Sequence, residues 1–141
     1  MTKIAPTSLK TLVKRADHVV VARIVKVDMV DADGGSVADL EARTGPGAGN
    51  TIRLHVDTDP GGILKAGKTP IPTRLVVSDW PMWHRSLGDM KEREGTDVVL
   101  LLRGDDFSAV SEPEFIRDIE EAGAIRALLA RSGWTRFFPW A

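Results

Sequence analysis

The first part of the chain changes from a helical spacing of apolar residues to a strand-like one. Residues 9–16 place Leu, Leu, Val and Ala at i, i+3, i+4 and i+7, which predicts a short amphipathic helix capped by Thr7 or Ser8. The run from Asp17 to Val30 follows, dense in β-branched residues and interrupted by Arg23 and Lys26. β-Branched side chains fit a pleated surface, so we expect one long strand, bent so that different stretches face the core.

Shorter apolar runs predict four further strands. From Thr51 to Asp57 apolar and polar residues alternate strictly, which is typical of a half-buried strand, and Asp59-Pro-Gly-Gly62 is expected to end it. The other three strands are expected at 73–78, 97–103 and 107–110. Because the centre of 97–103 is entirely apolar, both faces of that strand should be covered.

Two more helices are predicted in the second half of the chain. Residues 81–94 space their apolar side chains loosely for a short helix, which Gly95 would stop. Glu112 and Pro113 suit a helix N-terminus, since proline fits the first turn and acidic side chains favour its positive end. The helix that they open would present one apolar face between Phe115 and Leu129.

This order of elements predicts a mainly β (α+β) chain that forms one domain over residues 1–141. Five strands with a helix between the third and the fourth follow the order of the OB-fold, a small Greek-key barrel. We therefore expect a five-stranded OB-like barrel with a short N-terminal helix and a C-terminal helix.

Two segments, Ala16–Val27 and Gly62–Gly67, are similar to the first strand and to the end of the second strand in one group of small proteins. These are small bacterial OB-like barrels related in shape to tissue inhibitors of metalloproteinases. The resemblance implies the barrel fold and implies no particular activity, because such proteins mostly have none assigned.

Two segments fall outside the regular pattern. Residues 31–50 contain glycine clusters around a weakly helical stretch, Val37 to Arg43, and a loop this long in a compact domain is mobile or functional. Residues 132–141 hold two Trp and two Phe. Such an aromatic tail would be an apolar patch in water, so we expect it to dock on its own domain or to form a homodimer contact.

Composition narrows the classes of partner. The net charge is −1, with 19 basic and 20 acidic residues, so general attraction to phosphate backbones is absent and nucleic acid is an unfavoured partner. With no cysteine, disulfides and thiolate metal sites are excluded. No apolar run approaches a membrane span. We expect no cofactor and a cytoplasmic location, with export through a leader outside this sequence as the alternative.

The segment Gly62–Thr69 matches the pattern of a phosphate-binding P-loop, but its context argues against that function. A P-loop needs a helix that begins at its Lys-Thr pair, so that backbone N–H groups hold the phosphates. Here Pro70-Ile-Pro72 follows at once, and Pro72 disfavours helical backbone at Ile71. We expect a turn between two strands instead.

Histidines offer weak candidates for chemistry. His55 and Asp57 lie on one face of the predicted strand with Asp59 just beyond, a set that could bind a metal or transfer a proton. The competing interpretation is a solvated face on which Arg53 and Asp57 exchange charge, and we favour it. For His18 we expect a capping or surface role.

The segment Ser78–Ser86 has the most distinctive composition, with two Trp, one His, one Arg and one Asp in nine residues. Trp and Arg anchor binding surfaces, although two Trp could also plug one end of a barrel. Candidate ligand-binding residues are Trp80, Trp83, His84 and Arg85. A hydrolytic trio of Asp79, His84 and Ser86 can be drawn, but the strand-to-helix elbow of such enzymes is missing.

The sequence favours a non-enzymatic binding or protein-interaction module whose ligand contacts lie in the Trp80 to Arg85 region and on the loop 31–50. One alternative is a small hydrolase or metal-dependent enzyme that uses His55 and Asp57, or Asp79 and His84. A second alternative is single-stranded nucleic-acid binding, which requires a basic groove with stacking aromatics. The residues available for that purpose are Trp80, Trp83, Arg53 and Arg74.

Overall fold

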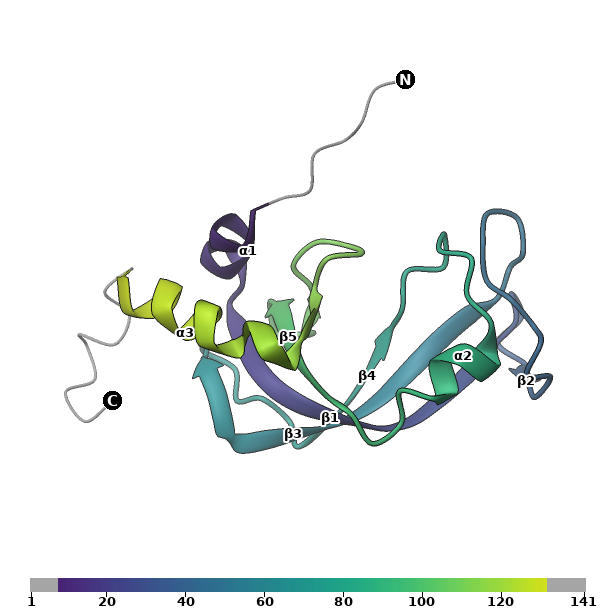
Figure 1. Ribbon diagram of the computed structural model, residues 1–141, viewed down its shortest axis with the longest axis horizontal. Helices are drawn as coiled ribbons and strands as arrows, with labels where there is room; N and C mark the ends of the chain where they lie inside the picture. The colour runs from purple at the N-terminus through teal and green to yellow at the C-terminus, as the bar shows by residue number, and fades with distance from the viewer. Residues whose placement is uncertain (1–7, 132–141) are drawn as a thin grey trace, which may run out of the picture. The chain divides into compact units, whose positions relative to one another are not determined.

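The computed structural model describes residues 8–131, which are mainly β with three α-helices (Figure 1). The helices are α1 (Leu9–Arg15), α2 (Leu87–Lys91) and α3 (Ala122–Arg131). The strands are β1 (His18–Val30), β2 (Ser36–Val37), β3 (Thr51–Lys65), β4 (Arg74–Ser78), β5 (Asp97–Arg103), β6 (Ser108–Ala109) and β7 (Ile116–Asp118). The predictions of a mainly β chain and of its long first strand are confirmed. No helix in the described range is long and apolar enough to cross a membrane.

The strands form one seven-stranded sheet whose main path runs β4-β3-β1-β5-β6. β2 pairs with β1, and β7 pairs with β5. The pairs are antiparallel where β1 meets β2, where β3 meets β4 and where β5 meets β6. Within the described residues the path is open, with β4 and β6 at its ends. The sheet therefore has more strands than the predicted five and is not closed.

The chain divides into two compact units, and β1, β3 and β5 each contribute to both. Unit 1 contains the described parts of residues 1–21, 61–71 and 99–141, and unit 2 contains residues 22–60 and 72–98. Both units bury apolar strand residues, so each has a core of its own.

The core of unit 1 lies where α1, α3 and the second half of β5 bury their apolar side chains. Leu12 of α1, Ile125 of α3 and Leu100–Leu102 of β5 are fully buried, and α1 and α3 lie in contact. Ser8 caps α1, because its Oγ accepts a hydrogen bond from the Thr11 N–H at 3.2 Å. The prediction that both faces of β5 are covered is confirmed.

His18 is part of the unit 1 core, so the expectation of a surface role was wrong. Its side chain is only 2% exposed and lies against the Phe107 ring, with 4.7 Å between ring centroids. Its Nδ1 accepts the Gly67 N–H at 3.2 Å, and its Nε2 donates to the Gly104 carbonyl at 2.9 Å. Since one nitrogen accepts and the other donates, the neutral ring ties two loops together.

Three predicted elements differ from the observed ones because tertiary pairing replaced local preference. β3 continues through Asp59-Pro-Gly-Gly62 to Lys65, where we expected a turn. The helix expected from Glu112 begins at Ala122, because the segment before it pairs with β5, where the Leu101 N–H donates to the Phe115 carbonyl. Of the stretch predicted as weakly helical, Val37 to Arg43, the first residue ends β2, which pairs with the end of β1, and the remaining residues form no helix. Backbone groups next to an open strand are better satisfied by pairing than by an isolated helix turn.

Candidate functional site

The sequence-predicted Trp segment forms a tight turn in unit 2, between β4 and α2. We call residues Asp79–Arg85 the Trp83 turn. The Trp83 N–H donates to the Trp80 carbonyl at 3.2 Å and closes the turn. The two indoles meet edge to face, with 5.7 Å between centroids at 87°. Trp80 is half-buried, whereas Trp83 is 43% exposed, so the inner ring supports the outer one.

Arg85 holds the second side of Trp83. Its guanidinium carbon lies 5.5 Å from the centroid of the Trp83 ring, within the range of a cation–π contact. On its other side, Arg85 Nε lies 2.8 Å from Asp79 Oδ2. Neither of these two atoms has a hydrogen-bond partner among the described residues, so the contact is an ion pair without an aligned N–H. Asp79, Arg85 and Trp83 thus form a stack that leads outward from a buried carboxylate.

Burial has the largest influence on the pKa of Asp79. The side chain is 8% exposed, and loss of solvation raises the pKa of its carboxyl above the ordinary value. The Arg85 charge, the Trp80 backbone N–H and the Arg93 charge all act in the opposite direction without cancelling that effect. The carboxylate at the base of the Trp83 turn is therefore poorly solvated and imperfectly paired.

The loop 31–50 braces the Trp83 turn through backbone contacts. The Thr44 Oγ1–H donates to the Trp83 carbonyl at 2.5 Å, and the Thr44 N–H donates to the Arg85 carbonyl at 2.9 Å. Arg43 Nη2 donates to the His84 carbonyl at 3.4 Å, and Arg43 forms a β-bridge with Ser86. The loop 31–50 and the Trp83 turn therefore lie against each other and form one surface.

Gly45 permits this close packing. Its φ of +143° lies in the region that favours glycine, and a Cβ there would stand 2.7 Å from His84 Nδ1. Only glycine lets the loop pass the His84 ring without displacing it.

The braced surface carries exposed apolar side chains. Leu40 is 53% exposed, Met82 is 42% exposed and Trp83 is 43% exposed. The Leu40 carbonyl accepts the Gly88 N–H at 2.8 Å, which fixes this part of the loop on the helix that follows the turn. Large apolar groups are thus presented to solvent by a backbone that is held in place.

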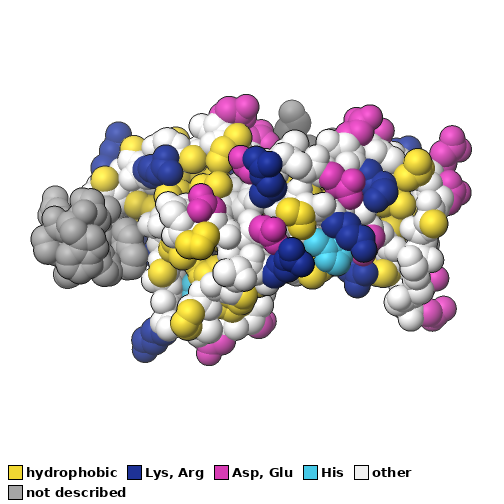
Figure 2. Space-filling model, turned by 90° about the horizontal axis from the view of Figure 1, so that it is seen from below, with side chains coloured by type: hydrophobic (Ala, Val, Ile, Leu, Met, Phe, Trp, Pro, Cys, Tyr) yellow, Lys and Arg dark blue, Asp and Glu magenta, His cyan; other side chains and the backbone are white. Residues whose placement is uncertain are grey.

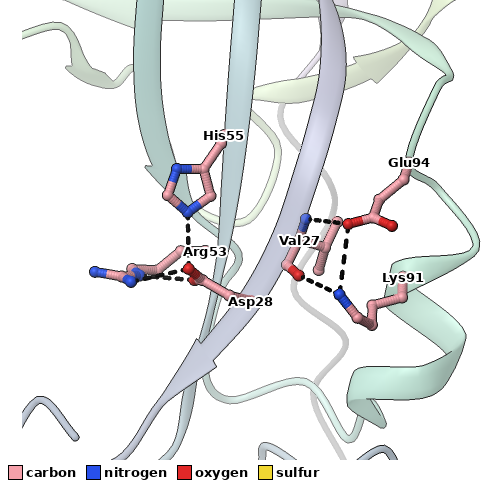
Figure 3. Close-up of polar contacts among 6 residues, drawn as sticks. All are labelled: Val27, Asp28, Arg53, His55, Lys91 and Glu94. Atoms are coloured by element: carbon pink, nitrogen blue, oxygen red, sulfur yellow. Dashed lines mark hydrogen bonds and ion pairs between the residues drawn. The ribbon is translucent and has the colours of Figure 1, made fainter. Parts of the chain in front are cut away.

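A second cluster lies on the sheet of unit 2, around Asp28 of β1 (Figure 3). Arg53 of β3 donates two hydrogen bonds to the Asp28 carboxylate, at 2.8 and 3.0 Å, and His55 Nε2 donates a third at 2.9 Å. The hydrogen bonds from Arg53, reinforced by His55, lower the pKa of Asp28 to about 2 against the opposing effect of burial. All three side chains are therefore committed to one another.

Next to this cluster, charged side chains complete the pairing of β1 (Figure 3). The Val27 N–H donates to Glu94 Oε2 at 2.8 Å, and Lys91 Nζ donates to the Val27 carbonyl at 3.0 Å. Lys91 and Glu94 also form an ion pair at 3.5 Å. At Ile24, earlier in β1, the backbone N–H and carbonyl are instead paired with backbone groups, because the Ile24 N–H donates to the Thr96 carbonyl and the Ile24 carbonyl accepts the Gly95 N–H. Lys91 and Glu94 serve the fold.

The structure does not gather His55, Asp57 and Asp59 into a metal site. His55 binds Asp28, and Asp57 accepts a hydrogen bond from Arg74 at 2.9 Å. No group of three potential metal-ligating side chains occurs anywhere in residues 8–131. The favoured interpretation was a solvated face on which Arg53 pairs with Asp57, and these partners were wrong. Arg53 pairs with Asp28, and Asp57 pairs with Arg74.

The drawn trio of Asp79, His84 and Ser86 is not assembled either. Asp79 pairs with Arg85, and the Ser86 Oγ accepts the Asp89 N–H at 3.1 Å as the N-cap of α2. The His84 ring lies against Gly45. Each member is thus used for a different local contact.

Figure 2 shows Lys and Arg side chains gathered beside a histidine, with Asp and Glu side chains among them. Arg53 and Arg74, the basic candidates for nucleic-acid binding, are each paired with an aspartate. The Gly62–Thr69 segment begins as strand, and no helix follows its Lys-Thr pair.

Sequence reasoning missed the Asp28 cluster, and it could not place the aromatic tail. Asp28 was one polar residue inside a β-branched run, and only the register of β1 against β3 brings it to Arg53. The tail 132–141 lies outside the described residues.

Comparisons with protein-family models, with curated proteins and with solved structures found no match to this chain.

Proposed function

We propose that the protein is a non-enzymatic binding module that engages another protein through the Trp83 turn and the loop that braces it. The observation that carries the proposal is an exposed tryptophan whose ring contacts the Trp80 ring and the Arg85 guanidinium, and whose backbone carbonyl accepts a hydrogen bond from the Thr44 hydroxyl. The complementary surface on the partner would be an apolar pocket that receives the Trp83 indole.

The composition of this surface agrees with the energetics of protein interfaces. Trp, Met and Arg are enriched in interface cores, and a few buried Trp or Arg side chains carry most of the binding free energy. A side chain that is already ordered loses little conformational entropy when it binds. Because its backbone and both ring neighbours are fixed, Trp83 meets this condition better than a solitary surface Trp.

The ion pairs formed by the candidate catalytic side chains disfavour the enzymatic alternatives. His55 and Asp79, the titratable groups that such a mechanism would use, already pair with Asp28 and with Arg85. A catalytic base needs a free position from which to accept a proton from substrate. We therefore expect His55→Ala and His84→Ala to leave the binding activity in place.

For the fold, we propose a five-stranded OB-like barrel akin to the small bacterial proteins that the sequence resembles. Its support is the order of elements along the chain, in which α2 lies between β4 and β5 as the OB-fold helix lies between its third and fourth strands. Its five strands would be β1, β3, β4, β5 and β6, and the additional short strands β2 and β7 would be edge pieces of that arrangement.

Site-specific photo-crosslinking tests the binding function. Benzoyl-phenylalanine replaces Met82, next to Trp83, and the chain is irradiated in the cells that make it. We expect one discrete adduct, identified by mass spectrometry, whose yield falls at least about tenfold when Trp83→Ala is added, as for an interface hot spot. The same photo-reactive residue at Val76, exposed on β4, is the positional control and should give no adduct.

Urea unfolding of each variant first establishes that it is folded. An adduct at Met82 whose yield is the same with Trp83→Ala would contradict the role of the Trp83 turn, as would the absence of any discrete adduct. Loss of the adduct with His84→Ala at full stability would instead favour a role for the histidine.

A further inference from the structure

Unit 1 contains a cavity of about 430 Å³ between α1, the end of β3 and α3. This volume lies within the ordinary range of small-molecule sites. Apolar and cationic side chains line it: Val13, Leu128 and Leu129, with Lys10, Lys14, Lys65 and Arg131. Figure 1 shows α1 next to α3, and the two helices lie in contact.

The charges around this cavity are unbalanced. Among the lining side chains that belong to residues 8–131, four are cationic and none is acidic. Lys10, Lys14 and Arg131 form no ion pair with any residue in the described part of the chain. Lys10 and Lys14 are four residues apart on α1, an arrangement in which like charges destabilise a helix. An anion placed between them would relieve this repulsion.

Lys65, which lines the cavity, places its ammonium at the end of α1. Its Nζ donates to the Val13 carbonyl at 3.2 Å and to the Lys14 carbonyl at 3.4 Å, at the C-terminal end of α1. An ammonium has three N–H donors, so one remains for a ligand. Burial lowers the pKa of Lys65, while the Asp17 charge opposes this effect. The Asp17 carboxylate accepts the Gly104 N–H at 2.8 Å.

We propose that this cavity binds an apolar monocarboxylate, a fatty acid of medium chain length. Its hydrocarbon chain would lie on Val13, Leu128 and Leu129, and its carboxylate would lie among the lysines. The apolar floor explains why the ligand carries a hydrocarbon chain, and the unpaired cationic rim explains why it carries a negative charge. This inference concerns unit 1 alone and is independent of the Trp83 turn.

Isothermal titration of the full chain with dodecanoate, below its micelle concentration, tests the proposal. We expect 1:1 binding, weakened at least about tenfold by Lys10→Glu combined with Lys14→Glu, as loss of close charge contacts predicts. Arg126→Glu is the matched control, because it reverses one charge on an exposed position of α3 that does not line the cavity. That variant should bind dodecanoate as the unaltered chain does.

Further measurements separate a fatty acid from other occupants. Dodecanol, which lacks the carboxylate, should bind at least about tenfold more weakly. In amide NMR spectra, the resonances of Val13, Leu128 and Leu129 should shift upon addition of dodecanoate. Lys10→Gln with Lys14→Gln repeats the test without introducing acidic side chains on the helix.

Four outcomes would overturn the proposal. They are no binding of dodecanoate, equal binding by the Lys10→Glu and Lys14→Glu variant, equal affinity for dodecanol, and shifts confined to residues outside the cavity. If sedimentation shows a dimer that these substitutions dissociate, and dodecanoate does not bind, the occupant is a second copy of the chain.

Discussion

Asp28 and Asp79 each lie 2.8 Å from an arginine Nε in the same compact unit, yet their surroundings differ. Asp28 receives two aligned hydrogen bonds from Arg53 and one from His55. Asp79 is more deeply buried, and the Arg85 atom closest to it makes no hydrogen bond within residues 8–131. The Arg53 guanidinium is occupied by its two hydrogen bonds to the Asp28 carboxylate, whereas the Arg85 guanidinium also contacts the exposed ring of Trp83.

This difference separates a structural cluster from a binding surface. A carboxylate whose oxygens already accept several hydrogen bonds has little capacity to bind a ligand. The Asp28 cluster therefore links β1 to β3 and has a structural role only. The imperfect pair at Asp79 keeps Arg85 in place beneath Trp83 without satisfying it completely. Polar groups that are held but not saturated, beside exposed apolar groups, are typical of recognition sites.

Removing each carboxylate in turn is the strongest way to break the comparison. Asp28→Ala should lower the free energy of unfolding by about 2 kcal/mol, because it removes a carboxylate that accepts three hydrogen bonds from Arg53 and His55. Asp79→Ala should cost about 1 kcal/mol, since burial already disfavours the ionised form of this carboxyl and Arg85 is exposed enough to be rehydrated. Urea denaturation with an unchanged m-value measures both losses. A larger loss for Asp79→Ala than for Asp28→Ala would reverse the assigned roles.

The packing of the loop 31–50 on the Trp83 turn predicts a loss of stability of similar size for a substitution at Gly45. Gly45→Ala should lower the free energy of unfolding by about 2 kcal/mol, since it adds a contact with His84 to the strain of a positive φ. Gly47→Ala is the matched control: φ is +79° there, and a Cβ would meet nothing within 4 Å. It should cost about 1 kcal/mol. Urea denaturation of both variants supplies the comparison.

His84→Ala in the Gly45→Ala background should recover the difference between the two glycine variants, because it removes the obstructing ring. Equal costs at Gly45 and Gly47, or no recovery in the double variant, would mean that the loop does not press on His84.

The features of the fold and of the candidate site that could be predicted are those encoded by neighbouring residues in the sequence. The limits of β1 and β5 were predictable within about a residue, since each is a continuous β-branched or apolar run. The aromatic content of the Trp83 turn was equally visible, and it marked the region that the structure shows to be braced and exposed. The pairing of Asp28 with Arg53 depends on the alignment of two strands, which no local pattern encodes.

Partners that are distant in sequence also explain the incorrect predictions. Glu112 and Pro113 are good helix-starting residues, but the edge of β5 offered hydrogen bonds that the segment before α3 could complete. His18 lies at the start of a strand and was expected to have a capping or surface role, yet its ring is buried and both ring nitrogens bond backbone groups of Gly67 and Gly104, which are distant in sequence. In both cases the deciding partner is distant in sequence.

The dependence of stability on pH gives the finest test, because the two carboxyls predict opposite signs. Hydrogen bonds from Arg53 and His55 lower the pKa of Asp28 from 3.8 to about 2, so its contribution to stability is complete above about pH 4 and is lost as the pH falls toward 2. Burial raises the pKa of Asp79, so its contribution is present at acid pH and is lost as the pH rises through the folded-state pKa.

Carbon-13 NMR of the side-chain carboxyls, recorded from pH 2 to 7, measures both values directly. The Asp28 signal should keep the shift of the ionised form at pH 3, while the Asp79 signal should titrate above the ordinary range of aspartate. In unfolding experiments, Asp79→Asn should gain stability relative to the unaltered chain as the pH rises, whereas the loss from Asp28→Asn should shrink as the pH falls below 4. If both carboxyls titrate on the same side of pH 3.8, the Trp83 turn and the Asp28 cluster share one electrostatic environment, and the contrast from which the binding surface was inferred disappears.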